Sequence, residues 1–256
     1  MRPNIVSRKL YLLRHPFWAI FNKAVSKRIG HRVAAGPFEG MKYTSSSVGS
    51  AYHPKIFGIY EMELRPVIGQ ILQKGFDVVV NVGGGEGYYA VGLALRMPAL
   101  EVIVFEMAEE GRLRILEIAE SNGVSDRVHI KGWCDSTGLE SALERSTRKC
   151  LVVMDVEGAE KELLNPTSVP QLRSAYILVE VHDFLDESIG DEIRKRFCAS
   201  HDFKEIRPKK RLMADLPKGF LPWPLLPPTC LARSIDEKRP EKLMWFYMTP
   251  REVLLP

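Results

Sequence analysis

The sequence has few cysteines and none of the spacings that would make them a framework. Its 256 residues include four cysteines, and no two of these form a CxxC pair. Zinc fingers and small secreted disulfide scaffolds need closely spaced thiols, so both classes are excluded. We therefore expect reduced thiols and a cytoplasmic protein.

Long apolar runs and a strong charge imbalance are also lacking. The best apolar candidate, residues 10–21, is broken by Arg14, His15 and Pro16, well short of the roughly 18 residues that span a bilayer. It also lacks the small-residue cleavage site of a signal peptide. The net charge is only +4, without the continuous basic face of a nucleic-acid binder, so we expect no nucleic-acid partner.

The first 35 residues mix basic and apolar side chains, with Pro16 interrupting the helical pattern. One interpretation is a basic amphipathic segment that makes a peripheral contact with a membrane. The other, which we favour, is a helical extension packed on the main domain or on a second subunit of a homo-oligomer. Residues 36–56 are rich in Gly, Ser and Pro and predict irregular structure. We thus expect an N-terminal extension over 1–58 and a main domain over 59–256.

From residue 77 onward, predicted strands alternate with predicted helices. The strands are expected at 77–82, 101–105, 127–131, 150–154, 176–181 and 243–248, and the helices at 88–97, 109–121, 139–145 and 189–199. Such alternation predicts right-handed crossovers and a mostly parallel sheet that is covered on both faces. Residues 208–242 hold many prolines and no clear periodicity, which indicates a long insertion within the main domain.

The strongest local signal is a glycine loop between the first strand and the first helix of this series. The sequence Asn-Val-Gly-Gly-Gly-Glu-Gly at 81–87 contains GxGxG at Gly83, Gly85 and Gly87. Glycines there allow a tight turn and a close approach of the backbone to a ligand. The nicotinamide fingerprint GxGxxG would need a glycine at Tyr88, and no YxxxK motif occurs. The loop therefore argues against a nicotinamide-dependent oxidoreductase.

Two acidic residues follow the next two strands. Glu106 closes the second strand about twenty residues after the loop, where a carboxylate accepts hydrogen bonds from both hydroxyls of a ribose. Asp135, after the third strand, is placed to accept from an adenine amino group while Trp133 or Cys134 packs on the ring. Alternatively, Asp135 is an ordinary acidic residue of a loop and the Trp133 indole packs in the core. The neighbouring Tyr88 and Met107 complete the predicted nucleotide site.

With these motifs the sequence resembles the class I S-adenosylmethionine methyltransferases, and more narrowly the FkbM-like group. The resemblance covers roughly residues 59–181 and the terminal strand, and rests on NVGGGEGYY, VFE, NGV, MDVEGAE and ILVEVHD. It implies a Rossmann-like three-layer α/β sandwich whose seven-stranded, mostly parallel sheet has the order 3-2-1-4-5-7-6. It further implies S-adenosylmethionine as cofactor and O-methylation of a hydroxyl on a sugar, glycan or related small molecule.

One position departs from the family pattern. Asn81 stands where the group usually has an acidic residue at the start of the glycine motif. An amide still hydrogen-bonds the amino-acid part of the cofactor, but the charge contact to its ammonium is lost. Glu61 or Glu63 would have to supply tighter binding. The departure keeps open an alternative, a non-catalytic cofactor-binding or scaffold protein of the same fold.

Two acidic clusters follow the fourth and fifth strands, where doubly wound sheets bind ligands. Asp155 and Glu157 follow the fourth strand, and Glu180, His182 and Asp183 lie at the end of the fifth. We expect Asp155, Glu157 and His182 to be catalytic, with Glu157 or His182 as the base that removes the hydroxyl proton. Alternatively, Asp155, Glu180 and Asp183 hold Mg²⁺, which lowers the pKa of the acceptor. The plain structural alternative is that Glu157 lies near a helix start and Glu180 satisfies backbone donors.

Overall fold

The computed structural model describes residues 16–44, 47, 50–144, 149–217, 228–240 and 242–251. The chain divides into two compact units, one formed by residues 1–60 and 210–237 and the other by residues 61–209 and 238–256. Residues 210–237, which make up most of the proline-rich stretch, group with residues 1–60 in the smaller unit.

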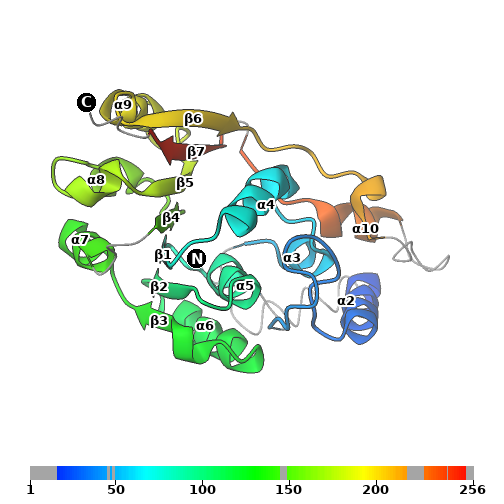
Figure 1. Ribbon diagram of the computed structural model, residues 1–256. Coiled ribbons are helices and arrows are strands. Elements are labelled where there is room, and N and C mark those ends of the chain that lie inside the picture. The colour runs from blue at the N-terminus through cyan, green and yellow to red at the C-terminus, as the bar shows by residue number, and fades with distance from the viewer. Residues whose placement is uncertain are drawn as a thin grey trace. The chain divides into compact units, whose positions relative to one another are not determined.

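The larger unit is built on one sheet. Its strands are β1 (Val78–Val82), β2 (Glu101–Phe105), β3 (Val128–Lys131), β4 (Cys150–Met154), β5 (Tyr176–Val181), β6 (His201–Ile206) and β7 (Met244–Pro250). Over the described residues the sheet has seven strands in the order β3-β2-β1-β4-β5-β7-β6 (Figure 1). Strand β7 pairs antiparallel with β5 and β6, and the other pairs are parallel. The predicted Rossmann-like fold class is confirmed.

Helices cover both faces of this sheet. They are α4 (Arg65–Lys74), α5 (Tyr88–Arg96), α6 (Glu109–Ser121), α7 (Ser136–Glu144), α8 (Glu160–Leu163) and α9 (Ile189–Phe197). Helices α4, α5 and α6 lie on one side of the sheet and α7, α8 and α9 on the other (Figure 1). Every residue of the central strands β1 and β4 is buried, which explains why neither alternates: β4 is a continuous apolar run, and β1 is apolar except for Asn81.

The smaller unit contains α2 (Pro16–Ile29), α3 (Tyr52–Phe57) and α10 (Pro228–Ile235). Helices α2 and α3 both contact α10, and Phe21 and Val25 of α2 are buried. Pro16 is the first residue of α2, where a fixed φ and a missing N–H are tolerated, so the predicted interruption falls at a helix end. Residues 1–15 lie outside the described part of the chain. Among the described residues, no helix has the length and hydropathy needed to cross a membrane.

Candidate functional site

The carboxyl ends of the parallel strands carry the predicted site residues. The loop after β1 is tied to β2, because the N–H groups of Gly83 and Gly84 both donate to the Phe105 carbonyl at 3.0 Å. Gly83 has φ +78°, and a Cβ there would lie 1.7 Å from the Asp155 carbonyl oxygen. Only glycine fits at that position. Gly85 also has a positive φ, of +55°, but a Cβ there would meet nothing within 4 Å, so the loop faces open space at Gly85.

The Glu106 carboxylate is held directly beside this loop. One oxygen accepts from the Gly85 N–H at 2.7 Å, and the other accepts from the Ala108 N–H at 2.8 Å. Helix α6 approaches closely, since a Cβ on Gly111 would lie 2.6 Å from Glu106 Cγ. The backbone thus fixes the carboxylate in one orientation at the end of β2.

The side chains predicted to flank an adenine differ in their exposure. Met107 and Trp133 are 69% and 68% exposed, the highest exposed fractions among the large apolar side chains of the described residues. Cys134 is buried, and burial together with the charge of Asp135 raises the pKa of its thiol to about 12. Asp135 accepts from the Gly138 N–H at 2.7 Å and therefore also stabilises the start of α7. Tyr88 is buried in the first turn of α5.

Asn81 and Glu61 occupy different surroundings. Asn81 lies in β1 and donates from Nδ2 to the Val153 carbonyl at 3.2 Å, while its buried Oδ1 accepts no hydrogen bond from any described residue. Glu61 is 1% exposed. Its carboxylate accepts from the Tyr89 hydroxyl and forms an ion pair with Arg239. The oxygens of Glu61 are thus engaged within the protein, whereas Asn81 offers an acceptor.

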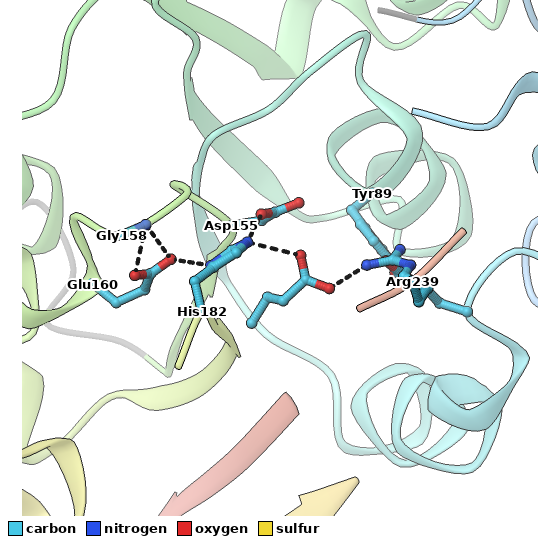
Figure 2. Close-up of polar contacts among 8 residues, drawn as sticks. Tyr89, Asp155, Gly158, Glu160, His182 and Arg239 are labelled. Atoms are coloured by element: carbon cyan, nitrogen blue, oxygen red, sulfur yellow. Dashed lines mark hydrogen bonds and ion pairs between the residues drawn. The ribbon is translucent and has the colours of Figure 1, made fainter. Parts of the chain in front are cut away.

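Asp155 follows β4, and His182 follows β5. Figure 2 shows the His182 ring between Glu160 and Asp155. Glu180 contacts the same ring nitrogen as Asp155. His182 Nδ1 is 2.5 Å from Glu160 Oε1. His182 Nε2 is 3.6 Å from Asp155 Oδ1 and 3.5 Å from Glu180 Oε2. The other oxygen of Glu180 forms an ion pair with Arg239.

The members of this cluster differ in how much of each side chain is exposed to solvent. Glu160, Glu180 and His182 are buried, whereas the Asp155 side chain is 38% exposed. Burial alone lowers the pKa of His182, but the hydrogen bond and charge of Glu160 and the charge of Asp155 outweigh it, and the pKa is raised. Removal from water raises the pKa of the Asp155 carboxyl, although part of that side chain still reaches solvent. The cluster therefore has one half-exposed side, at Asp155.

Two other predicted residues are not among the direct contacts described above, although the charge of Glu157 acts to raise the pKa of both Asp155 and His182. Asp183 accepts from the Gly190 N–H at 2.8 Å and so holds the start of α9. Glu157 is exposed and has a left-handed backbone, with φ +48°. The structure thus groups His182, and not Asp183, with Asp155 and Glu180.

Sequence reasoning missed three contributors to the site: Glu160, Tyr89 and Arg239. Glu160 stands in the DVEGAE motif, and its carboxylate accepts from the Gly158 N–H at 3.0 and 3.2 Å. Its position at the helix start was visible, but its reach to His182 was not. Arg239 lies in the proline-rich stretch, where no pattern points to a buried ion pair.

Several solved structures are similar to this chain. A precorrin-6Y C5,15-methyltransferase from Geobacter metallireducens is 11% identical over 73% of this chain and 87% of its own, with a TM-score of 0.48. An O-methyltransferase from Bacillus cereus, in complex with SAH, is 12% identical over 54% and 70%, with a TM-score of 0.42. A precorrin 8W decarboxylase from Methanobacterium thermoautotrophicum is 17% identical over 73% and 89%, with a TM-score of 0.47. No protein-family model and no curated protein match the chain. At such identities and TM-scores these likenesses carry no argument about function, which must come from the chain's own residues.

Proposed function

We propose that the protein is an S-adenosylmethionine-dependent methyltransferase that methylates a hydroxyl group. The observation that carries the proposal is the Glu106 carboxylate, which the Gly85 and Ala108 N–H groups hold beside the glycine loop. Each carboxylate oxygen keeps a further lone pair, which is the acceptor pair that a ribose diol requires at the end of the second strand. The acceptor class, a sugar, glycan or related small molecule, rests on the FkbM-like resemblance alone.

The residues present fit this cofactor. Glu106 would hold the ribose, and the exposed Met107 and Trp133 would cover the adenine. The buried Asn81 Oδ1, which accepts nothing from the described residues, matches the ammonium donor of the amino-acid part. When bound, the cofactor supplies an electrophilic methyl group on a sulfonium, whose sulfur keeps the electron pair as the methyl leaves.

The chain must then align the acceptor and remove its hydroxyl proton. We assign this task to the ends of β4 and β5. Asp155 is the half-exposed member of the cluster, and Glu157 is exposed two residues later. His182 is oriented by its contact with Glu160, so its Nε2 faces Asp155 and Glu180. These groups are the candidates for binding the hydroxyl and moving its proton.

Calorimetry with S-adenosylhomocysteine tests the cofactor assignment. Glu106→Ala should weaken binding roughly 10- to 150-fold, because hydrogen bonds to a charged acceptor contribute about 1.5–3 kcal/mol. Glu101→Ala is the matched control, since Glu101 begins the same strand and is exposed beside His129. It should bind like the wild type. Binding of NAD without binding of S-adenosylhomocysteine would contradict the proposal.

Asn81 favours one second candidate, a cofactor-binding protein without catalysis, because the usual acidic residue is absent there. Methyl-labelled cofactor separates the two. Transfer of label to hydroxyl groups of sugars or glycans supports the enzyme, whereas tight binding with no transfer across such acceptors supports the non-catalytic protein.

A further inference from the structure

One group of side chains has the composition and spacing of a metal centre. Among the described residues, Asp155, Glu180 and His182 are the one set of three in which a ligand atom from each lies within 4.8 Å of the others. His182 Nε2 is 3.5 Å from Glu180 Oε2 and 3.6 Å from Asp155 Oδ1, longer than hydrogen bonds of the usual 2.7–3.2 Å. Ligand atoms about 2.1 Å from one ion in tetrahedral geometry are about 3.4 Å apart. For both contacts of His182 Nε2, the observed spacing matches that arrangement better than it matches hydrogen bonding, while Asp155 and Glu180 lie close enough to share a hydrogen bond.

From this geometry we propose that Asp155, Glu180 and His182 bind a first-row transition-metal dication such as Mn²⁺, Fe²⁺ or Zn²⁺. The catalytic role of this metal site rests on the proposed function. The existence of the site is argued from the side chains alone. It differs from the magnesium site expected from the sequence, because His182 takes the place of Asp183.

In each of the two buried ligands, His182 and Glu180, the side-chain atom that faces away from the site already has a partner. His182 Nδ1 contacts Glu160 Oε1 at 2.5 Å, and Glu160 is itself fixed by the Gly158 N–H. Glu180 Oε1 forms an ion pair with Arg239, and Oε2 is the oxygen that faces the histidine. Metal-bound histidines almost always donate a hydrogen bond from the N–H of their second ring nitrogen to such an outer partner, and metal-bound carboxylates are hydrogen-bonded in turn. Glu160 is therefore a positioning residue for this site.

The ligand types select the class of ion. Mg²⁺ and Ca²⁺ prefer oxygen ligands alone, whereas imidazole suits zinc, iron and other transition metals. The Asp155 side chain is 38% exposed, so the coordination positions beside it are open to water or to an acceptor hydroxyl. An ion here would engage His182 Nε2, so the exposed Glu157 is the remaining candidate base. A hydroxyl bound beside Asp155 would lose its proton more readily, because a bound dication lowers the pKa of its ligands.

Metal titration of the full-length protein tests the site directly. Chelator-treated wild type should bind one equivalent of Co²⁺, used as a spectroscopic probe, and one of Zn²⁺ or Mn²⁺ by calorimetry. His182→Ala and the isosteric Asp155→Asn should abolish this binding, and Glu160→Gln should weaken it 10- to 100-fold. Asp183→Asn is the control and should bind like the wild type, since Asp183 holds the Gly190 N–H instead.

Asp155→Asn keeps the test valid if His182→Ala fails to fold, because Asp155 is partly exposed. Absence of stoichiometric Co²⁺, Zn²⁺ and Mn²⁺ binding overturns the proposal, as does binding of Mg²⁺ alone. Equal loss in Asp183→Asn and Asp155→Asn also overturns it. If S-adenosylhomocysteine still binds in those cases, the proposed function survives. If metal binds and S-adenosylhomocysteine does not, the proposed function fails and the metal site stands.

Discussion

Arg239 should be one of the most sensitive positions in the larger unit. Its guanidinium forms ion pairs with Glu61 and Glu180, whose carboxylates are both buried. Arg239→Met removes the positive charge while retaining most of the side-chain volume. Breaking a buried ion pair by removing one partner costs about 3–5 kcal/mol, because the remaining charge stays desolvated. With about 2–4 °C per kcal/mol for a protein of this size, the midpoint of thermal unfolding should fall by roughly 10 °C.

Arg251→Met is the matched control for this measurement. Arg251 also forms an ion pair, with Asp202 at 2.8 Å, but both side chains are at least half exposed. Exposed pairs contribute at most about 1 kcal/mol, so this variant should unfold within a few degrees of the wild type. Thermal unfolding followed by circular dichroism compares the two.

A second substitution tests the cause of the loss. In the Arg239→Met background, Glu61→Gln removes one buried charge and should recover part of the stability, so the two effects should not be additive. If Arg239→Met and Arg251→Met unfold at the same temperature, or if Glu61→Gln adds to the loss, the buried charges do not control stability and the reasoning is wrong.

Three further predictions concern separate parts of the chain. Gly83→Ala should destabilise the protein by more than Gly85→Ala in chemical denaturation, because only at Gly83 would the new methyl group meet a backbone oxygen; Gly85→Ala should cost about 1–2 kcal/mol from its positive φ alone. Trp133→Ala should weaken S-adenosylhomocysteine binding by calorimetry without changing the unfolding midpoint, since Trp133 is largely exposed. Burial lowers the pKa of His53 to about 4. The free energy of unfolding should therefore be highest above pH 6.5 and fall by up to about 3 kcal/mol toward pH 4, because the unfolded state binds the proton first. His53→Phe should flatten this pH dependence.

The sheet could be predicted where burial on both faces makes a strand a continuous apolar run. The bounds of β2, β4 and β5 agree with the expected 101–105, 150–154 and 176–181. Strand β6 was not predicted, because His-Asp-Phe-Lys-Glu-Ile carries polar residues on its exposed positions at the edge of the sheet. Edge strands lack the double burial that produces the apolar signal.

The candidate site likewise contains contacts that the sequence could predict and contacts that it could not. The position of Glu106 beside the glycine loop was predictable, because its carboxylate binds backbone groups of the adjoining loops and follows its strand at a fixed spacing. The link between Glu160 and His182 joins residues on separate elements, and the link between Arg239 and Glu61 spans most of the chain. Hydrophobic periodicity reports which face of an element is buried, but it holds no information about which charged groups meet across the sheet.

The two halves of the site are built differently and meet where β1 pairs with β4. The half at β1 and β2 combines backbone N–H groups, a neutral amide and one carboxylate, which suits a nucleoside with an amino-acid tail. The half at β4 and β5 combines an imidazole with carboxylates, which suits a proton or a cation. Gly83 lies where they touch, because the Asp155 carbonyl oxygen fills the space that a side chain would need there. Substitutions at Glu106 and at His182 should therefore separate cofactor binding from metal binding, whereas a side chain at Gly83 would displace Asp155 and disturb both.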